Sequence, residues 1–137
     1  MKATALLLTL ASLLGLPAHA ADLRIHVDDV RSGAGQIMVA LYDSEGRFMK
    51  QALHSASVAA VQGSTTVDFK DLPAGEYAFA VVHDANANGK MDRNFMGVPS
   101  EDYAFSNNAL GKMGPAAYAD ARFSLPAGGA AVRVSLR

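Results

Sequence analysis

Short runs in which apolar and polar residues alternate constrain this chain more than any other feature of its sequence. The alternation occupies residues 23–28, 65–70, 121–125 and 132–136. Because successive side chains of a β-strand point to opposite faces of a sheet, a period of two indicates strands with one buried and one exposed face. These four runs therefore predict half-exposed strands.

Two other runs, residues 37–42 and 76–82, are apolar at almost every position. Strands that are apolar on both faces are typical of the interior of a sheet, so we expect both to be central strands. Residues 32–35, 71–75 and 126–129 contain the Gly, Pro, Ser and Asp residues that favour turns. The first of these, Ser32-Gly33-Ala34-Gly35, predicts a hairpin turn between two strands.

Residues 45–60 have a less regular pattern, which predicts a short helical turn at 48–53 and an edge strand at 57–61. Six to seven strands without a long helical pattern predict an all-β fold, an antiparallel β-sandwich of the immunoglobulin-like kind. Residues 84–118 lack this regularity and are predicted to form one long inserted loop. Because structureless loops of this length are uncommon in compact domains, we expect the loop to carry a function.

The first 20 residues have the features of a secretory signal peptide. A basic start at Lys2 precedes an almost wholly apolar run over residues 3–16, and Ala18 and Ala20 are the small residues expected before a cleavage site. We therefore expect cleavage after Ala20 and a periplasmic or secreted protein; a buried N-terminal helix is the alternative. Residues 21–137 are enough for a single domain and contain no run that could span a membrane.

The composition excludes several classes of function. With 12 Lys and Arg against 13 Asp and Glu, the chain has a formal net charge of −1 and no basic cluster of the kind that binds nucleic acid. The chain has no cysteine, which rules out disulfides, thiol catalysis and cysteine-based metal sites. Its stability therefore depends on the core and on any ion that the domain binds.

The most informative motif begins at the end of the second apolar run. Oxygen-bearing side chains recur at every second position in Asp84, Asn86 and Asn88, and Gly89 and Asp92 follow. Calcium loops have this order, with side-chain oxygens at positions one, three and five, a glycine at six, and a backbone carbonyl at seven. Counted from Asp84, position seven is Lys90, whose carbonyl is the expected ligand.

The loop departs from the EF-hand pattern at position twelve. That position is Phe95, which cannot ligate, so a carboxylate from further along the chain has to close the site; Glu101 is our choice, with Asp102 as the alternative. The few carboxylates predict a weak calcium site, with a Kd on the order of 10⁻⁴ to 10⁻³ M. The predicted metal ligands are Asp84, Asn86, Asn88, the carbonyl of Lys90, Asp92 and Glu101.

Two other interpretations of the same region stay open. Asn88-Gly89 is a common hairpin-turn dipeptide, so the loop is alternatively a plain hydrogen-bonded turn. His83, with Tyr103 and Ser106 downstream, supplies residue types used in acid–base or nucleophilic catalysis. The chain has no Gly-x-Ser-x-Gly motif, and His83 at a strand end is alternatively a residue that orients the loop.

Several spaced motifs follow one another along the chain: FxDLPxGxYA at residues 69–78, HDxNxNGKxD at 83–92, GxPxE at 97–101 and FSNNA at 105–109. Their succession resembles an uncharacterised family of exported bacterial proteins, a domain of unknown function. The strand-turn-strand element is also similar to prealbumin-like and carboxypeptidase-regulatory-like β-sandwiches. The resemblance implies a periplasmic or secreted single domain and brings no established activity.

Together these features predict a non-enzymatic exported domain whose Asp- and Asn-rich loop binds calcium and orders a surface for an envelope or extracellular partner. The first alternative is a metal-independent module that binds a peptide, a glycan or another envelope component. The second is a periplasmic hydrolase that uses His83. The pattern identifies neither the partner nor the oligomeric state.

Overall fold

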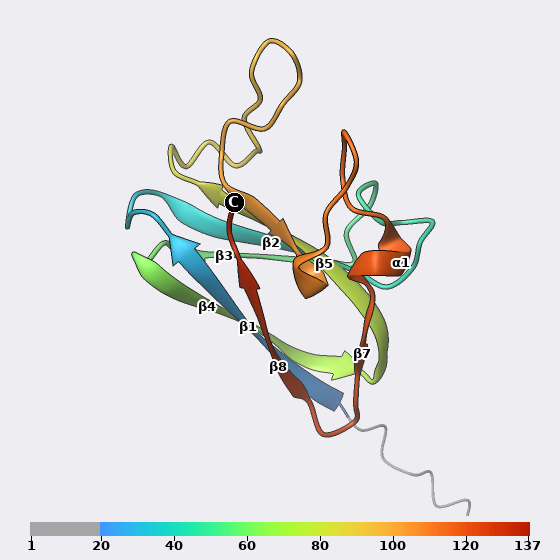
Figure 1. Cartoon of the computed structure of the whole chain (residues 1–137). Coiled ribbons are helices and arrows are strands. Elements are labelled where there is room, and N and C mark those ends of the chain that lie inside the picture. Colours follow the sequence, from blue (N-terminus) through green and yellow to red (C-terminus); the bar gives the residue numbers. More distant parts are fainter. Residues whose placement is uncertain (1–19) are drawn as a thin grey trace, which may run out of the picture.

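The computed structural model describes residues 20–137, so the predicted signal peptide, apart from Ala20, lies outside the described residues. The chain forms two β-sheets packed face to face (Figure 1), which confirms the predicted all-β sandwich. The three-stranded sheet has the order β4 (Gly63–Pro73), β1 (Ala20–Val30), β8 (Ala130–Ser135). The five-stranded sheet has the order β3 (His54–Ala59), β2 (Gln36–Tyr42), β5 (Gly75–Asp84), β6 (Tyr103–Phe105), and β7 (Phe123–Leu125) pairs with the other end of β5.

The core lies between the two sheets and is formed by the apolar members of the alternating runs. Leu23, Ile25 and Val27 of β1 have no exposed surface, while the residues between them are exposed or half-buried. Their burial against the opposite sheet supplies the main stabilising free energy of the fold, roughly 1.5–3 kcal/mol per side chain. The predicted central strands β2 and β5 lie inside the five-stranded sheet, as expected from their apolar sequences.

The predicted hairpin at residues 32–35 is wrong. These residues connect β1 to β2, which belong to different sheets, so the turn crosses the sandwich. The turns at residues 71–75 and 126–129 likewise join strands of different sheets. The strand pairing also differs from the predicted, wholly antiparallel arrangement. β8 pairs with β1 in parallel, with Leu23 opposite Ala130 and Asp28 opposite Ser135. A period of two determines which face a residue occupies and leaves the pairing partner open.

The connection between β2 and β3 contains hydrogen-bonded turns at residues 44–51, where Phe48 N–H donates to Ser44 O and Gln51 N–H donates to Arg47 O. The helical turn predicted at 48–53 therefore lies a few residues earlier and is not a regular helix. The edge strand predicted at 57–61 is β3, which also begins and ends earlier. It occupies the edge of the five-stranded sheet as expected.

The predicted long loop at residues 84–118 is not a single irregular segment. It contains β6 and a 3₁₀ turn, η1 (Ser106–Asn108), and ends at a short helix, α1 (Tyr118–Ala121). We call residues 84–102, which include the last residue of β5, the Asp/Asn loop, and residues 105–122, which include the last residue of β6, the Ser106 segment. The Asp/Asn loop projects beyond the end of the sandwich in Figure 1, above the label of β2. Within residues 20–137, no helix is long and apolar enough to cross a membrane.

Candidate functional site

The root of the Asp/Asn loop is fixed by the turn that joins β1 to β2. The buried His83 ring lies with Nε2 2.8 Å from the carbonyl oxygen of Ala34. Gly35 has φ +65°, and a Cβ atom there would collide with the carbonyl oxygens of Asp84 and Ala85. Gly35 is therefore required both for the backbone conformation and for the close approach of the two chains. His83 thus links the root of the loop to the turn that precedes β2, a contact that fits the interpretation of this residue as one that orients the loop.

Asp84 lies at the end of β5, has no exposed surface and organises the first turn of the loop. Its Oδ1 accepts a hydrogen bond from Asn88 N–H (3.1 Å), and its Oδ2 accepts from Gly89 N–H and from Gln36 Nε2 (both 2.8 Å). Desolvation raises the pKa of Asp84, but the hydrogen bonds from Gln36, Gly89 and Asn88 outweigh it and the pKa is lowered. The loop therefore holds an ionised carboxylate at its first position.

Asp92 closes the turn from the other side. Its two oxygens accept hydrogen bonds from the side-chain amides of Asn88 (2.7 Å) and Asn86 (2.6 Å), and these bonds lower its pKa. The amide oxygens of the same two asparagines accept backbone N–H groups, Asn88 N–H on Asn86 and Lys90 N–H on Asn88. Four of the predicted ligands thus belong to one continuous hydrogen-bonded turn, to which Lys90 contributes its backbone.

Of the two predicted closing carboxylates, only Glu101 reaches this turn. Its Oε2 lies 3.4 Å from Asp92 N. Desolvation, followed by the hydrogen bond to the Asp92 carboxylate and the negative charges of Asp92 and Asp84, raises the pKa of Glu101. Asp102 is instead paired with Arg31, whose Nε is 3.1 Å from Asp102 Oδ2. Asp102 therefore ties the end of the loop to β1, and Glu101 lies with the other predicted ligands.

The donor set is chemically suited to a hard cation, because every predicted ligand is an oxygen. Among residues 20–137, however, no three His, Cys, Asp or Glu side chains form a ready-made metal cluster. The oxygens of Asp92 are held by amide N–H groups of Asn86 and Asn88. A cation in this loop would have to replace these two donors and depend on amide and carbonyl oxygens for part of its coordination.

The motif FSNNA has a structural role that can be followed bond by bond. Ser106 is buried, and its Oγ accepts the N–H of Phe79 (3.0 Å) and donates to the carbonyl of Ala121. One hydroxyl therefore joins β5, η1 and α1. Because the Ser106 hydroxyl is committed to backbone groups and His83 to Ala34, the two residues that suggested a hydrolase are separate parts of the scaffold.

The two asparagines of this motif pin the same segment to its neighbours. Asn107 has φ +61° and donates from Nδ2 to the carbonyls of Asp120 (3.1 Å) and Arg122 (2.8 Å). Asn108 Oδ1 accepts the N–H of Ser135 in β8 (2.9 Å). These bonds satisfy backbone groups that would otherwise lack partners at the ends of short elements. Their role is to fix the Ser106 segment on the sandwich.

Sequence reasoning missed a groove of about 470 Å³ on the outer face of the five-stranded sheet. Residues of β2, β3, β5 and β6 form its floor, and Met49, Met91 and Arg93 contribute to its rim. The signal for it was in the sequence. A strand that is apolar on both faces in a two-layer sandwich can bury only one face against the other sheet, so runs 37–42 and 76–82 had to leave an apolar outer face.

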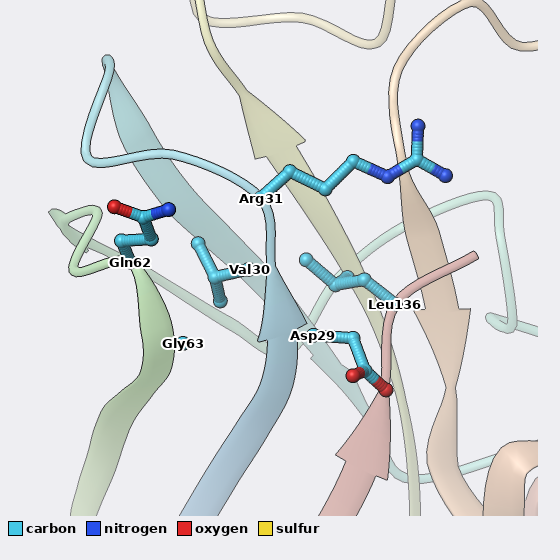
Figure 2. A pocket seen from close by; sticks show the side chains of 6 residues that line it. All are labelled: Asp29, Val30, Arg31, Gln62, Gly63 and Leu136. Atoms are coloured by element: carbon cyan, nitrogen blue, oxygen red, sulfur yellow. The ribbon is translucent and has the colours of Figure 1, made fainter.

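A second hollow, of about 440 Å³, lies at the junction of β1, β4 and the chain end. Figure 2 shows the charged end of Arg31 and the amide of Gln62 on opposite sides of it. Arg31 is paired with Asp102. Because the polar groups do not converge, this hollow has no arrangement suited to recognising a ligand.

One protein-family model matches the chain, over residues 25–133, with the description "Uncharacterized protein conserved in bacteria (DUF2141)". No curated protein and no solved structure matches the chain. The matched region begins within β1, ends within β8 and includes the whole Asp/Asn loop and the Ser106 segment. The resemblance to an uncharacterised bacterial family is thereby confirmed. The chain belongs to the bacterial family DUF2141.

Proposed function

We propose that this protein is an exported β-sandwich domain whose Asp/Asn loop binds one calcium ion and so orders a surface for a partner in the cell envelope or outside the cell. The observation that carries the proposal is a single hydrogen-bonded turn in which Asn88 donates to both Asp84 and Asp92, and Asp92 N–H donates to Glu101. Asn86 belongs to the same turn. The proposed ligands are the side-chain oxygens of these five residues and the carbonyl of Lys90.

The electrostatics of the turn support a cation. The raised pKa of Glu101 reflects, after desolvation, the neighbouring carboxylates of Asp92 and Asp84. A divalent cation would offset this repulsion and replace the amide donors that now satisfy Asp92. Calcium suits the loop better than magnesium, because calcium accepts six to eight oxygens in flexible geometry whereas magnesium requires a near-ideal octahedron.

Export is inferred from the sequence of residues 1–20, with its basic start, apolar run and small residues before the expected cleavage site. The absence of cysteine fits a domain that needs no oxidative folding. Calcium at millimolar concentration outside the cytoplasm would be enough for a site as weak as this one is expected to be.

The test is calorimetric unfolding of the mature protein in chelator and in millimolar calcium, together with limited proteolysis of residues 85–102. With a Kd on the order of 10⁻⁴ to 10⁻³ M, 1 mM calcium that binds only the folded state stabilises it by about 0.4–1.4 kcal/mol. We therefore expect the melting temperature to rise by a few degrees and cleavage in the loop to slow.

Two variants make this test specific. Asp92→Asn removes a proposed ligand charge from a half-buried position and should abolish the calcium response. Asp71→Asn is the matched control, because Asp71 is exposed near the end of β4 and Asn tolerates its φ of +57°. No change in melting temperature or proteolysis for the unmodified protein, or an equal response in Asp92→Asn, would contradict the proposal.

A metal-independent binding module is the second proposal, and one observation favours it. The carboxylates of Asp84 and Asp92 are already satisfied by hydrogen bonds within the loop and from Gln36, so the turn is closed without an ion. This alternative predicts that ligand binding is the same in chelator and in calcium. Measuring ligand binding in chelator and in calcium therefore distinguishes the two proposals.

A further inference from the structure

The outer face of the five-stranded sheet has two cross-strand rows that no other layer covers completely. In the first row Ser57, Met38, Val82 and Tyr103 lie opposite one another on β3, β2, β5 and β6. The second row runs through Ser55, Ala40, Ala80 and Phe105 on the same strands. The central members of both rows are apolar and only half-buried.

The two ends of this face are covered differently. An aromatic cluster packs over the end near the β2–β3 connection, where Phe48 contacts Tyr42 at 5.2 Å and Tyr118 at 5.6 Å between ring centroids. At the other end the Asp/Asn loop folds back, so that Gly89 and Met91 line the groove. The groove between these two covers has a floor of small and apolar side chains.

The rim of the groove is adaptable and carries one charge. Met38, Met49 and Met91 all line it, and unbranched thioether side chains adjust to irregular apolar ligands. Arg93 is the only charged residue among those lining the groove. Its Nη1 donates to the carbonyl of Gly97 (3.0 Å), and in the described part of the chain no carboxylate lies within salt-bridge distance of it. The arginine is therefore a cation with donors left for a ligand.

We propose that this groove binds a small amphiphilic anion, such as a free fatty acid, with its apolar body on the Met38–Val82 row and its anionic group at Arg93. A volume of about 470 Å³ lies within the range of small-molecule sites. An acidic rim would favour a cationic ligand, but no Asp or Glu lines the groove. The Asp/Asn loop forms one wall of the groove, so any effect of calcium on ligand binding rests on the proposed function. The binding of the anion itself does not depend on that proposal.

The experiment is an NMR titration of the mature protein, labelled at its methionine methyl groups, with monomeric dodecanoate. Met38, Met49 and Met91 should shift, whereas Met96 and Met113, which are 72% and 108% exposed and do not line the groove, should not. Shifts in all five methionines alike, or in none, would overturn the proposal. Dodecylammonium should bind more weakly than dodecanoate, and equal binding would overturn the role of Arg93.

Substitutions localise the two parts of the ligand. Arg93→Gln should weaken dodecanoate binding about threefold, as expected for a solvent-accessible ion pair, and leave the binding of neutral dodecanol unchanged. Lys112→Gln, an exposed charge outside the groove, is the matched control. Ala80→Leu, which fills the floor of the groove, should abolish the binding of both dodecanoate and dodecanol. If circular dichroism shows that this variant is unfolded, Ala40→Leu in the same row is tested instead.

The titration is run in chelator and in millimolar calcium. Stronger dodecanoate binding in calcium supports the coupling of loop and groove. Equal binding in both supports the groove alone and contradicts the coupling. If dodecanoate binds in neither condition, the proposal that the groove binds an anion is overturned. The calorimetric response to calcium tests the loop proposal independently. The groove proposal would also be overturned if the protein bound phospholipid vesicles but monomeric dodecanoate caused no methionine shifts.

Discussion

The Asp/Asn loop and the Ser106 segment are neighbours in sequence and similar in polar composition, but they are ordered in different ways. In the Asp/Asn loop the polar side chains bond to one another and to nearby backbone, close to solvent. In the Ser106 segment a buried hydroxyl and an aromatic cluster tie the chain to the sandwich. The contrast is sharpest for two phenylalanines, because Phe95 is 96% exposed and Phe105 is 4% exposed.

This difference teaches that Asn, Asp and Ser residues have no fixed meaning in a long connection. In the Ser106 segment they satisfy the backbone of packed elements, so their loss affects the whole fold. In the Asp/Asn loop they mostly satisfy one another. Exchanging these partners would leave the packed elements in place, which is what the proposed calcium site requires.

The largest expected effect separates the two phenylalanines. Phe105→Ala should lower the free energy of unfolding by about 3–5 kcal/mol, because it leaves a cavity beside Phe48, whose ring centroid lies 6.1 Å from that of Phe105. Phe95→Ala should change it by less than about 0.5 kcal/mol, since this side chain is in solvent. Urea unfolding measures both. Similar losses in the two variants would contradict the division into an anchored and a free region.

The next effect concerns the two serines at comparable places in the two regions. Ser106→Ala leaves the buried N–H of Phe79 and the carbonyl of Ala121 without their shared partner, and should cost about 1–3 kcal/mol. Ser100→Ala, in the exposed Asp/Asn loop, should be close to neutral. Urea unfolding again decides. A neutral Ser106→Ala would show that the hydroxyl does not join the three elements.

The smallest effect is the contribution of Tyr118, in the Ser106 segment, to the pH dependence of stability. Burial, and then the hydrogen bond to Glu76, raise the pKa of Tyr118 from 10 to about 12. Because the neutral phenol is favoured in the folded state, its contribution to stability is complete below pH 10 and is lost as the pH rises from 10 to about 12.

Burial also raises the pKa of Tyr42 and Tyr77. Absorbance titration of tyrosinate should therefore show several late-ionising groups, one of which, near pH 12, is missing in Tyr118→Phe. The stability of that variant should fall less steeply between pH 10 and 12 than that of the unmodified protein. Tyr103→Phe, at a half-buried tyrosine of β6, is the control for the titration. An unchanged alkaline profile in Tyr118→Phe would exclude Tyr118 as the source.

The faces of the strands could be predicted from the sequence, and their partners could not. Leu23, Ile25 and Val27 are inward-facing because alternation reports burial directly. The turn at residues 32–35 has the composition of a hairpin, yet it crosses between sheets, since turn residues specify a change of direction and not the next neighbour. β6 has only three residues, too few for any period to be recognised.

The candidate site was predictable to the same extent. The spacing of Asp84, Asn86 and Asn88 is local, and the turn that it predicted is present. Glu101, by contrast, meets Asp92 only because the loop closes back on itself, and its neighbour Asp102 pairs with Arg31 far away in sequence. The apolar outer face follows from the two apolar runs, but the groove on it depends on the register of four strands, which no one segment of the sequence encodes.

The parallel pairing of β1 with β8 has a consequence for the order of events in folding. Asp28 and Arg133, which bridge these strands, are 105 positions apart, so the three-stranded sheet cannot be completed until almost the whole chain is present. Closing so long a segment costs entropy before the contact is made, and folds rich in such pairings reach the native state slowly. A chain without β8 therefore keeps one flank of β1 open, so the segment that is last in this fold decides when the three-stranded sheet can close.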